Sequence, residues 1–299
     1  MEIGLVFAII AAIIFGAGDV LVRRGVFRAG ESYTAVLMSL FIGVLLFSLM
    51  ITVTAQWDTV RSISWRALGL LAGAGILHFV AGRSLYYASV RLIGANKASA
   101  ITKTDILTSV ILGIVILSES LTMPLVLGVL CIVPGVVLVS MEKQGVGTEE
   151  TSETYGIQAK GVLSGLGTGL CWGVSGILIK PAVREIGVPF IGTFVSYAVA
   201  FLVMASLLVR KGRREQLFQL NRSSSTLIAV AGVFSSAGQL LRFAALSYSP
   251  VSLVQPLVAT FVLYILLFSF LVNRNIEVFS LKVIIGMVLA VAGTFLLSS

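Results

Sequence analysis

The chain has 299 residues, of which 58% are hydrophobic and only 11% are charged. A water-soluble protein of this length could not bury so much apolar surface, which excludes the soluble classes and makes the lipid bilayer the expected solvent. The net charge of +8 comes from lysines and arginines in short segments between apolar runs, a pattern that sets topology and contacts anionic headgroups. We therefore expect the bilayer as a partner, and no nucleic acid.

Ten apolar stretches follow one another along the chain, and each approaches the ~20 residues that a helix needs to cross about 30 Å of hydrocarbon. They cover residues 3–22, 33–54, 67–90, 94–117, 122–141, 159–180, 188–209, 224–247, 251–272 and 280–298. The first stretch has no basic segment before it and no small-residue cleavage site after it, so we interpret it as a retained span. The sequence thus predicts an all-α membrane protein with ten transmembrane helices.

One polar run, EKQGVGTEETSETYGIQ at residues 142–158, separates the first five predicted spans from the last five. Its composition is typical of a linker between two units. We therefore divide the chain into a first five-helix unit, residues 1–141, and a second five-helix unit, residues 159–299.

The two units repeat each other. FGAGDVLVRRGV begins at Phe15, and WGVSGILIKPAV begins at Trp172, 157 positions later. AGRSLYYASV begins at Ala81, and AGQLLRFAAL begins at Ala237, 156 positions later. Because each unit has an odd number of spans, the second must enter the membrane inverted relative to the first. We predict two inverted five-helix repeats around a central cavity near the midplane, the architecture of alternating-access transporters.

These repeats resemble the EamA-type proteins of the drug/metabolite transporter superfamily. The resemblance is carried by the FG and WG pairs at 15–16 and 172–173, by YYASV and RFAAL at 86–90 and 242–246, and by a Glu-then-Gly pattern at 119/128 and 277/286. It covers nearly the whole chain and implies a cavity lined mainly by spans one, three, four, six, eight and nine. It also implies secondary transport or export of small metabolites, without naming the substrate.

Span four carries two charges near its middle, Lys103 and Asp105. On a continuous helix, residues two apart point about 200° away from each other, so we do not expect them to be each other's main partner. Charges inside hydrocarbon are costly and mark a pathway by default, and the alternative is that both belong to ion pairs between helices. We assign Lys103 to substrate binding and Asp105 to charge balance.

Polar residues recur at matching depths of spans three and eight, as an inverted-repeat cavity requires. Those assigned to substrate binding are Arg83, Tyr86 and Tyr87 in span three and Gln239 and Arg242 in span eight. His78 lines up with Gly75 and Gly82, which favours a packing histidine. The alternative is a proton relay, so His78 stays among the candidate coupling residues.

Three further spans contribute candidates. In span one, Asp19 stands four residues before Arg23, a spacing that favours an ion pair within the helix; the alternative is that Asp19 neutralises a cavity cation or takes a coupling proton. In span six, Trp172 either stacks on a substrate or packs the interior. In span nine, Gln255 precedes a proline that frees a backbone carbonyl, and Tyr264 offers a hydroxyl to the same wall.

No sequence motif for ATP hydrolysis or proteolysis appears, and nothing points to a catalytic residue, a metal site or a cofactor. We predict a multi-pass protein of the cell membrane that is not an enzyme, and that moves a small polar molecule on a gradient of protons or of a counter-substrate. The central cations outnumber the central acids, which favours a substrate that is amino-acid-like or otherwise bears a carboxylate or phosphate. The alternative is a flippase for a lipid-linked anion; a scaffold would not require a duplicated polar cavity.

The orientation follows from the basic residues at the ends of the spans. One side of the membrane receives 14 of them and the other side receives 4. The positive-inside rule then places both termini outside the cytoplasm, whereas the resemblance implies termini in the cytoplasm.

Overall fold

The computed structural model describes residues 2–29, 32–108, 112, 123–141, 152–209, 211–218, 222–248 and 257–297, and all regular structure within these ranges is helical. The elements of the first half are α1 (Glu2–Ala29), α2 (Ser32–Val53), α3 (Trp57–Arg61), α4 (Trp65–Gly75), η1 (Ile76–Gly82), α5 (Arg83–Ile93), α6 (Ala95–Ile101) and α8 (Met123–Met141). Those of the second half are α9 (Ser152–Ile186), α10 (Pro189–Ser206), η2 (Leu207–Val209), α11 (Lys211–Phe218), α12 (Arg222–Tyr248), α14 (Phe261–Val272) and α15 (Leu281–Leu297).

Within the described residues, six helical segments are long and apolar enough to cross a membrane. They are Ile3–Gly25, Tyr33–Val53, Trp65–Ile93, Tyr155–Val183, Pro189–Val209 and Arg222–Arg242, and three shorter apolar helices cover Val126–Val139, Leu257–Val272 and Leu281–Gly293. In hydrocarbon every backbone polar group must bond within the protein, which is why such stretches fold as helices. The predicted all-α membrane protein is confirmed. The count of ten spans stays a prediction, because the fourth runs past residue 108, where the described part is interrupted.

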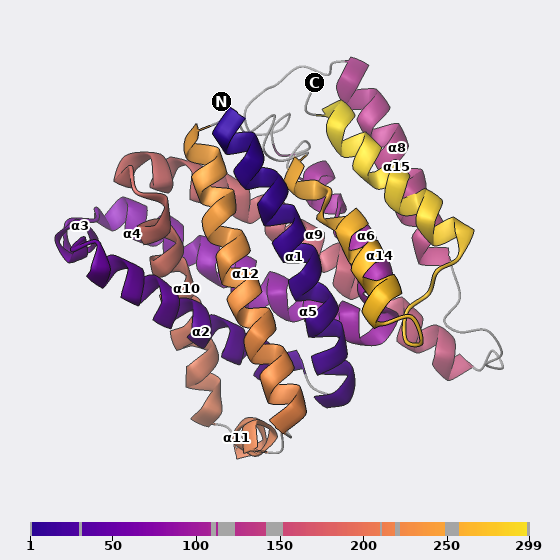
Figure 1. Ribbon diagram of the computed structural model, residues 1–299, viewed down its shortest axis with the longest axis horizontal. Coiled ribbons are helices and arrows are strands. Elements are labelled where there is room, and N and C mark those ends of the chain that lie inside the picture. Colours follow the sequence, from indigo (N-terminus) through magenta and orange to yellow (C-terminus); the bar gives the residue numbers. More distant parts are fainter. Residues whose placement is uncertain are drawn as a thin grey trace.

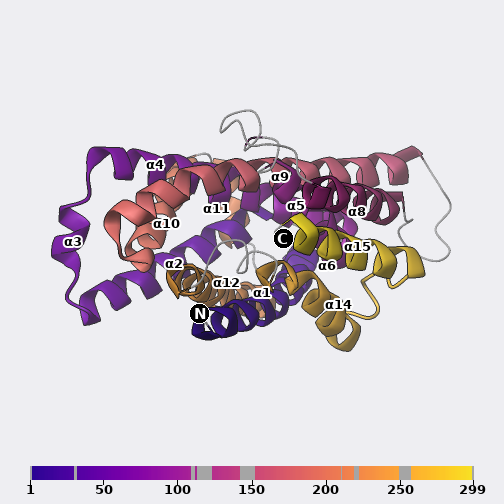
Figure 2. The ribbon, with the colours of Figure 1, turned by 90° about the horizontal axis from the view of Figure 1, so that it is seen from above.

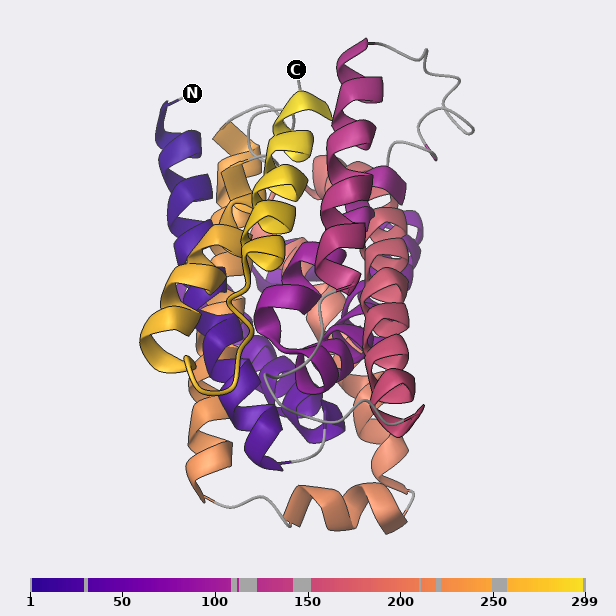
Figure 3. The same cartoon turned by 90° about the vertical axis from the view of Figure 1, so that its right-hand side faces the viewer.

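The two halves interlock through their first helices. α1 packs mainly against α12 and α14 of the second half, and α9 packs mainly against α4, η1 and α5 of the first half. Figure 1 shows α1 between α12 and α14, with the paired helices α8 and α15 at one edge. Figure 2 shows α1, α12 and α14 on one side of the molecule and α4, α9 and α10 on the other. In Figure 3, α11 lies across the end of the bundle opposite the chain termini.

Equivalent contacts hold both halves together. A Cβ atom on Gly82 of η1 would lie 2.6 Å from the Trp172 ring, and one on Gly238 of α12 would lie 2.7 Å from the Phe15 ring. Phe15 and Trp172 occupy matching positions of the repeat, as do the two glycines. Each half therefore inserts one aromatic side chain of its first helix into a gap on the third span of the other half.

Candidate functional site

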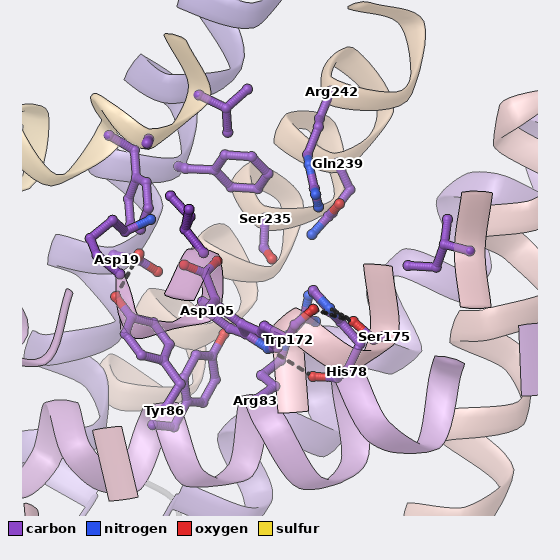
Figure 4. Close-up of a pocket in the computed structure, with 18 residues that line it drawn as sticks. Asp19, His78, Arg83, Tyr86, Asp105, Trp172, Ser175, Ser235, Gln239 and Arg242 are labelled. Carbon is purple, nitrogen blue, oxygen red and sulfur yellow. Dashed lines mark hydrogen bonds between the residues drawn. The ribbon is translucent and has the colours of Figure 1, made fainter. Parts of the chain in front are cut away.

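A cavity of about 120 Å³ lies between the two halves. Its walls come from α1, η1 and α5, the segment after α6, α9, α12 and the beginning of span nine, which are the six spans that the resemblance implied. Most predicted site residues line it: Asp19, His78, Arg83, Tyr86, Tyr87, Lys103, Asp105, Trp172, Gln239 and Arg242. Figure 4 shows these side chains converging from different helices.

One described site residue of the prediction, Tyr264, is not among the lining residues. The Tyr264 ring stacks on Phe268 with a centroid distance of 6.4 Å, and the Cβ of Tyr264 lies where Gly16 lets α1 approach α14 closely. Gln255 lies outside the described residues. Tyr264, which was predicted to line the cavity from span nine, therefore packs between helices.

The cavity wall also contains residues that sequence analysis did not assign to it: Phe15, Ile106, Ser175, Ile179, Ser235, Val258, Ala259 and Phe261. The position of Ser235 in the wall could have been predicted from the sequence. It precedes Gln239 by four residues and Arg242 by seven, a spacing that places three polar side chains on one face of α12. The positions of the apolar wall residues could not have been predicted, because in a membrane span nearly every residue is apolar whichever way it faces.

The helix of span four breaks where its charges lie. α6 ends at Ile101, and the backbone N–H groups of Lys103 and Asp105 then donate to carbonyls three residues back, at 3.1 and 2.9 Å. Span nine has a matching turn at Thr260, 157 positions after Lys103. The expectation of a continuous helix with Lys103 and Asp105 on opposite sides is therefore wrong, since the turn brings both to the same cavity. Interrupted helices at the midplane are typical of transporter binding sites.

The Arg83 guanidinium is held by protein groups. Its Nη2 donates to the Tyr197 hydroxyl at 2.9 Å and its Nη1 to Ser39 Oγ at 3.3 Å. The guanidinium carbon also lies 4.7 Å from the Phe79 ring centroid and 5.2 Å from that of Tyr197. These contacts fix its position in the wall and satisfy much of its charge through hydrogen bonds and cation–π attraction.

Lys103 and Arg242 are held less completely. Lys103 Nζ lies 4.4 Å from the Phe261 ring centroid, close enough for a cation–π attraction. The buried Nε of Arg242 has no acceptor among the described residues. In Figure 4 the Arg242 side chain points into the cavity beside Gln239. Both cations line the cavity.

Asp19 and Arg23 do not pair with each other, so the ion pair that their spacing favours is wrong. Asp19 Oδ2 accepts the Tyr86 hydroxyl at 2.7 Å and faces the cavity. Arg23 lies one turn further along α1, with its Nε 3.0 Å from Glu277 Oε1. The partner of Arg23 comes from the segment between α14 and α15, on the other half of the chain.

Arg23 and Glu277 are the centre of a hydrogen-bonded group, here called the Arg23–Glu277 cluster. The Arg23 guanidinium donates to the backbone carbonyls of Val90, Arg91 and Ile276. The Glu277 carboxylate accepts the first backbone N–H groups of α6, those of Ala95 and Asn96. The cluster thus joins the end of α1, the connection between α5 and α6, and the connection between α14 and α15.

His78 and Trp172 form one wall of the cavity. Their rings stack with centroids 5.2 Å apart and an interplanar angle of 17°. His78 Nδ1 lies 2.8 Å from Ser175 Oγ, and the Trp172 indole N–H donates to the His78 carbonyl at 3.1 Å. The histidine is therefore both packed and hydrogen-bonded at the cavity surface, so neither of the two roles considered for it is excluded by its position.

A polar cavity enclosed by apolar helices from two interlocked repeats defines a class of membrane transporters. The EamA-like transporter family matches residues 2–141 and 159–299, and the chain belongs to this family. Solved structures match as well: one crystal structure shares 16% identical residues over 95% of each chain, with a TM-score of 0.57, a likeness that concerns the fold. No curated protein sequence matches the chain.

Proposed function

We propose that this protein is a secondary active transporter of the cell membrane, an exporter or exchanger that moves a small polar metabolite by alternating access. The observation that carries the proposal is the cavity between the repeats, where the buried Nε of Arg242 has no acceptor among the described residues. A buried N–H group without an acceptor is costly. A substrate anion in the cavity would supply that acceptor.

The charges of the wall support a substrate with a carboxylate or phosphate. Arg83, Lys103 and Arg242 line the cavity together with two carboxylates, Asp19 and Asp105. Because Arg83 is engaged by Tyr197 and Ser39, Lys103 and Arg242 are the cations that receive the anion. The two carboxylates suit a substrate ammonium group, so an amino-acid-like zwitterion fits both signs of charge.

Coupling would use the acidic side of the wall, with Asp19, Asp105 and His78 as the groups that balance charge. Asp19 is the strongest candidate of these three for coupling, because its hydrogen-bond partner is the neutral hydroxyl of Tyr86. We expect Asp19→Asn to keep substrate exchange while abolishing accumulation driven by a proton gradient. Retained gradient-driven accumulation in Asp19→Asn would exclude Asp19 from coupling.

The proposal is tested by counterflow in proteoliposomes loaded with a mixed pool of amino acids and phosphorylated metabolites. We expect uptake of one anionic or zwitterionic class and its loss in Lys103→Met. Arg61→Met is the matched control, because the Arg61 side chain is 79% exposed and pairs only at the surface with Asp58. A flat response across the pool would overturn the proposal and favour the flippase, whose lipid-linked anion would be sought in the membrane.

A further inference from the structure

Span three contains one residue more than its counterpart in the second half. Gly75 closely approaches the backbone of Ser196, and Gly232 closely approaches the backbone of Ser39. Gly232 lies 157 positions after Gly75, and Ser196 lies 157 positions after Ser39, so this is one contact made twice. The offset between the repeats is therefore 157 as far as Gly75.

The offset falls to 156 within the next few residues, because Gly238, the counterpart of Gly82, lies 156 positions after it. Ile76 and Val233 are 42% and 44% exposed and face outward alike, which places the extra residue in the stretch after Ile76 that begins with Leu77. The insertion coincides with η1, a π-helical turn, whereas α12 is α-helical throughout. A π turn holds one extra residue per turn, so it absorbs the insertion without rotating the residues beyond it.

α9 supports this turn from a single face. The Trp172 indole N–H donates to the His78 carbonyl at 3.1 Å, and the same carbonyl accepts the π-type bond from the first residue of α5. Ser175 Oγ lies 2.8 Å from the His78 ring nitrogen, and Thr168 Oγ1 lies 3.3 Å from the Gly82 carbonyl. Side chains of neighbouring helices commonly add hydrogen bonds at irregular turns inside a membrane.

The matching face of α1 has no such donors. The residues 157 positions before Thr168, Trp172 and Ser175 are Ala11, Phe15 and Gly18. None of the three has a side-chain hydrogen-bond donor, and the helix against which they pack, α12, has no π turn. The inserted residue and the three polar side chains that contact its turn therefore occur together in one half, and both are missing from the other.

We propose that Trp172 is a positioning residue of the transport cavity, whose indole N–H holds the inserted residue of span three in a π turn and so sets where His78 and Arg83 stand in the wall. An extra residue in a continuous α-helix would turn every later side chain by about 100°. The π turn prevents this, so Tyr86 and Tyr87 keep positions that match span eight. The inference rests on the proposed function in so far as the cavity binds substrate.

The test uses four full-length proteins: the parent, Trp172→Phe, a deletion of Leu77, and the combination. Trp172→Phe copies Phe15, removing the donor together with the five-membered ring and keeping an aromatic side chain. We expect it to raise the KM for counterflow roughly fivefold, the value of one neutral hydrogen bond, with little change in maximal rate. The deletion should fold, because span eight fits without the extra residue, and in it Trp172→Phe should have a smaller effect, since the π turn that the indole N–H supports is gone.

Two readouts are independent of transport: the unfolding temperature, and the ring nitrogen resonances of His78, the single histidine of the chain. Trp172→Phe should lower the unfolding temperature and shift the His78 resonances more in the parent background than in the deletion background, where the loss of the stacked indole is the remaining change. Equal effects in the two backgrounds would overturn the inference, as would no change in KM or in the His78 resonances for Trp172→Phe alone. If none of the four proteins transports anything, the proposed function fails, and the unfolding and His78 measurements still decide whether Trp172 supports the turn.

Discussion

The bundle contains two groups of buried charges, and they differ in how completely the protein supplies their hydrogen-bond partners. In the Arg23–Glu277 cluster, the guanidinium faces a carboxylate and three backbone carbonyls, and the carboxylate also accepts two backbone N–H groups. In the cavity, the buried Nε of Arg242 has no acceptor among the described residues, although Asp19 and Asp105 line the same space.

Under the proposed function, the difference separates charges that hold the fold from charges that bind a substrate anion. Burying a charge is costly unless it is paired and hydrogen-bonded, and the Arg23–Glu277 cluster meets that requirement with groups of the chain itself. Arg242 meets it poorly while facing a cavity that a small anion could enter. Substitutions in the two groups should therefore have opposite effects on stability, and this contrast can be measured.

The largest expected effect is in the cluster. Glu277→Ala leaves Arg23 buried without its carboxylate and removes the acceptor for the first backbone N–H groups of α6. Removing one member of a buried pair costs about 3–5 kcal/mol, and we expect a loss of that size in the free energy of unfolding, measured in detergent micelles. Asp58→Ala is the control, because the Asp58–Arg61 pair is exposed and its loss should cost less than about 1 kcal/mol. Equal losses would contradict a structural role for the cluster.

The second-largest effect is expected in the cavity, where the free energy of unfolding should change in the opposite direction to that in Glu277→Ala. Arg242→Met removes a buried cation whose Nε has no acceptor in the described part of the chain, so the free energy of unfolding should stay the same or rise. Substrate affinity should fall by about 2–3 kcal/mol, the value of hydrogen bonds to a charged group, measured as KM in counterflow. A variant that unfolds as easily as Glu277→Ala would place Arg242 among the structural charges instead.

The helices and the two-repeat architecture could be predicted because they depend on apolar composition and on residues that recur at a fixed offset. The predicted pairing of Asp19 with Arg23 failed because spacing on one helix says nothing about a stronger partner elsewhere, here Glu277. The separation of Lys103 from Asp105 failed because it assumed a regular helix, and no apolar pattern marks a turn at residue 102.

The π turn is an intermediate case, because one part of it could be predicted from the sequence and another part could not. The offset of the repeats changes from 157 to 156 along the sequence, so the extra residue is visible there. The π turn that this residue produces is not visible in the sequence, because the hydrogen bond that supports it comes from Trp172, 94 positions after His78. Similarly, Arg83 was assigned to the cavity from its depth in span three, but its partner Tyr197 lies in a span that reads as uniformly apolar.

The smallest expected effect decides to which group Arg83 belongs, since it lines the cavity and yet is bound by protein. Tyr197→Phe removes the hydroxyl that accepts from Arg83 Nη2 and keeps the aromatic ring beside the guanidinium. If Arg83 is a structural charge, the free energy of unfolding should fall by about 1 kcal/mol, with KM nearly unchanged. Tyr33→Phe is the matched control, because its buried hydroxyl donates to the Met204 carbonyl at 2.7 Å away from the cavity. A changed KM in Tyr197→Phe, with KM unaltered in Tyr33→Phe, would instead join Arg83 to Lys103 and Arg242 as a third cation that the substrate contacts.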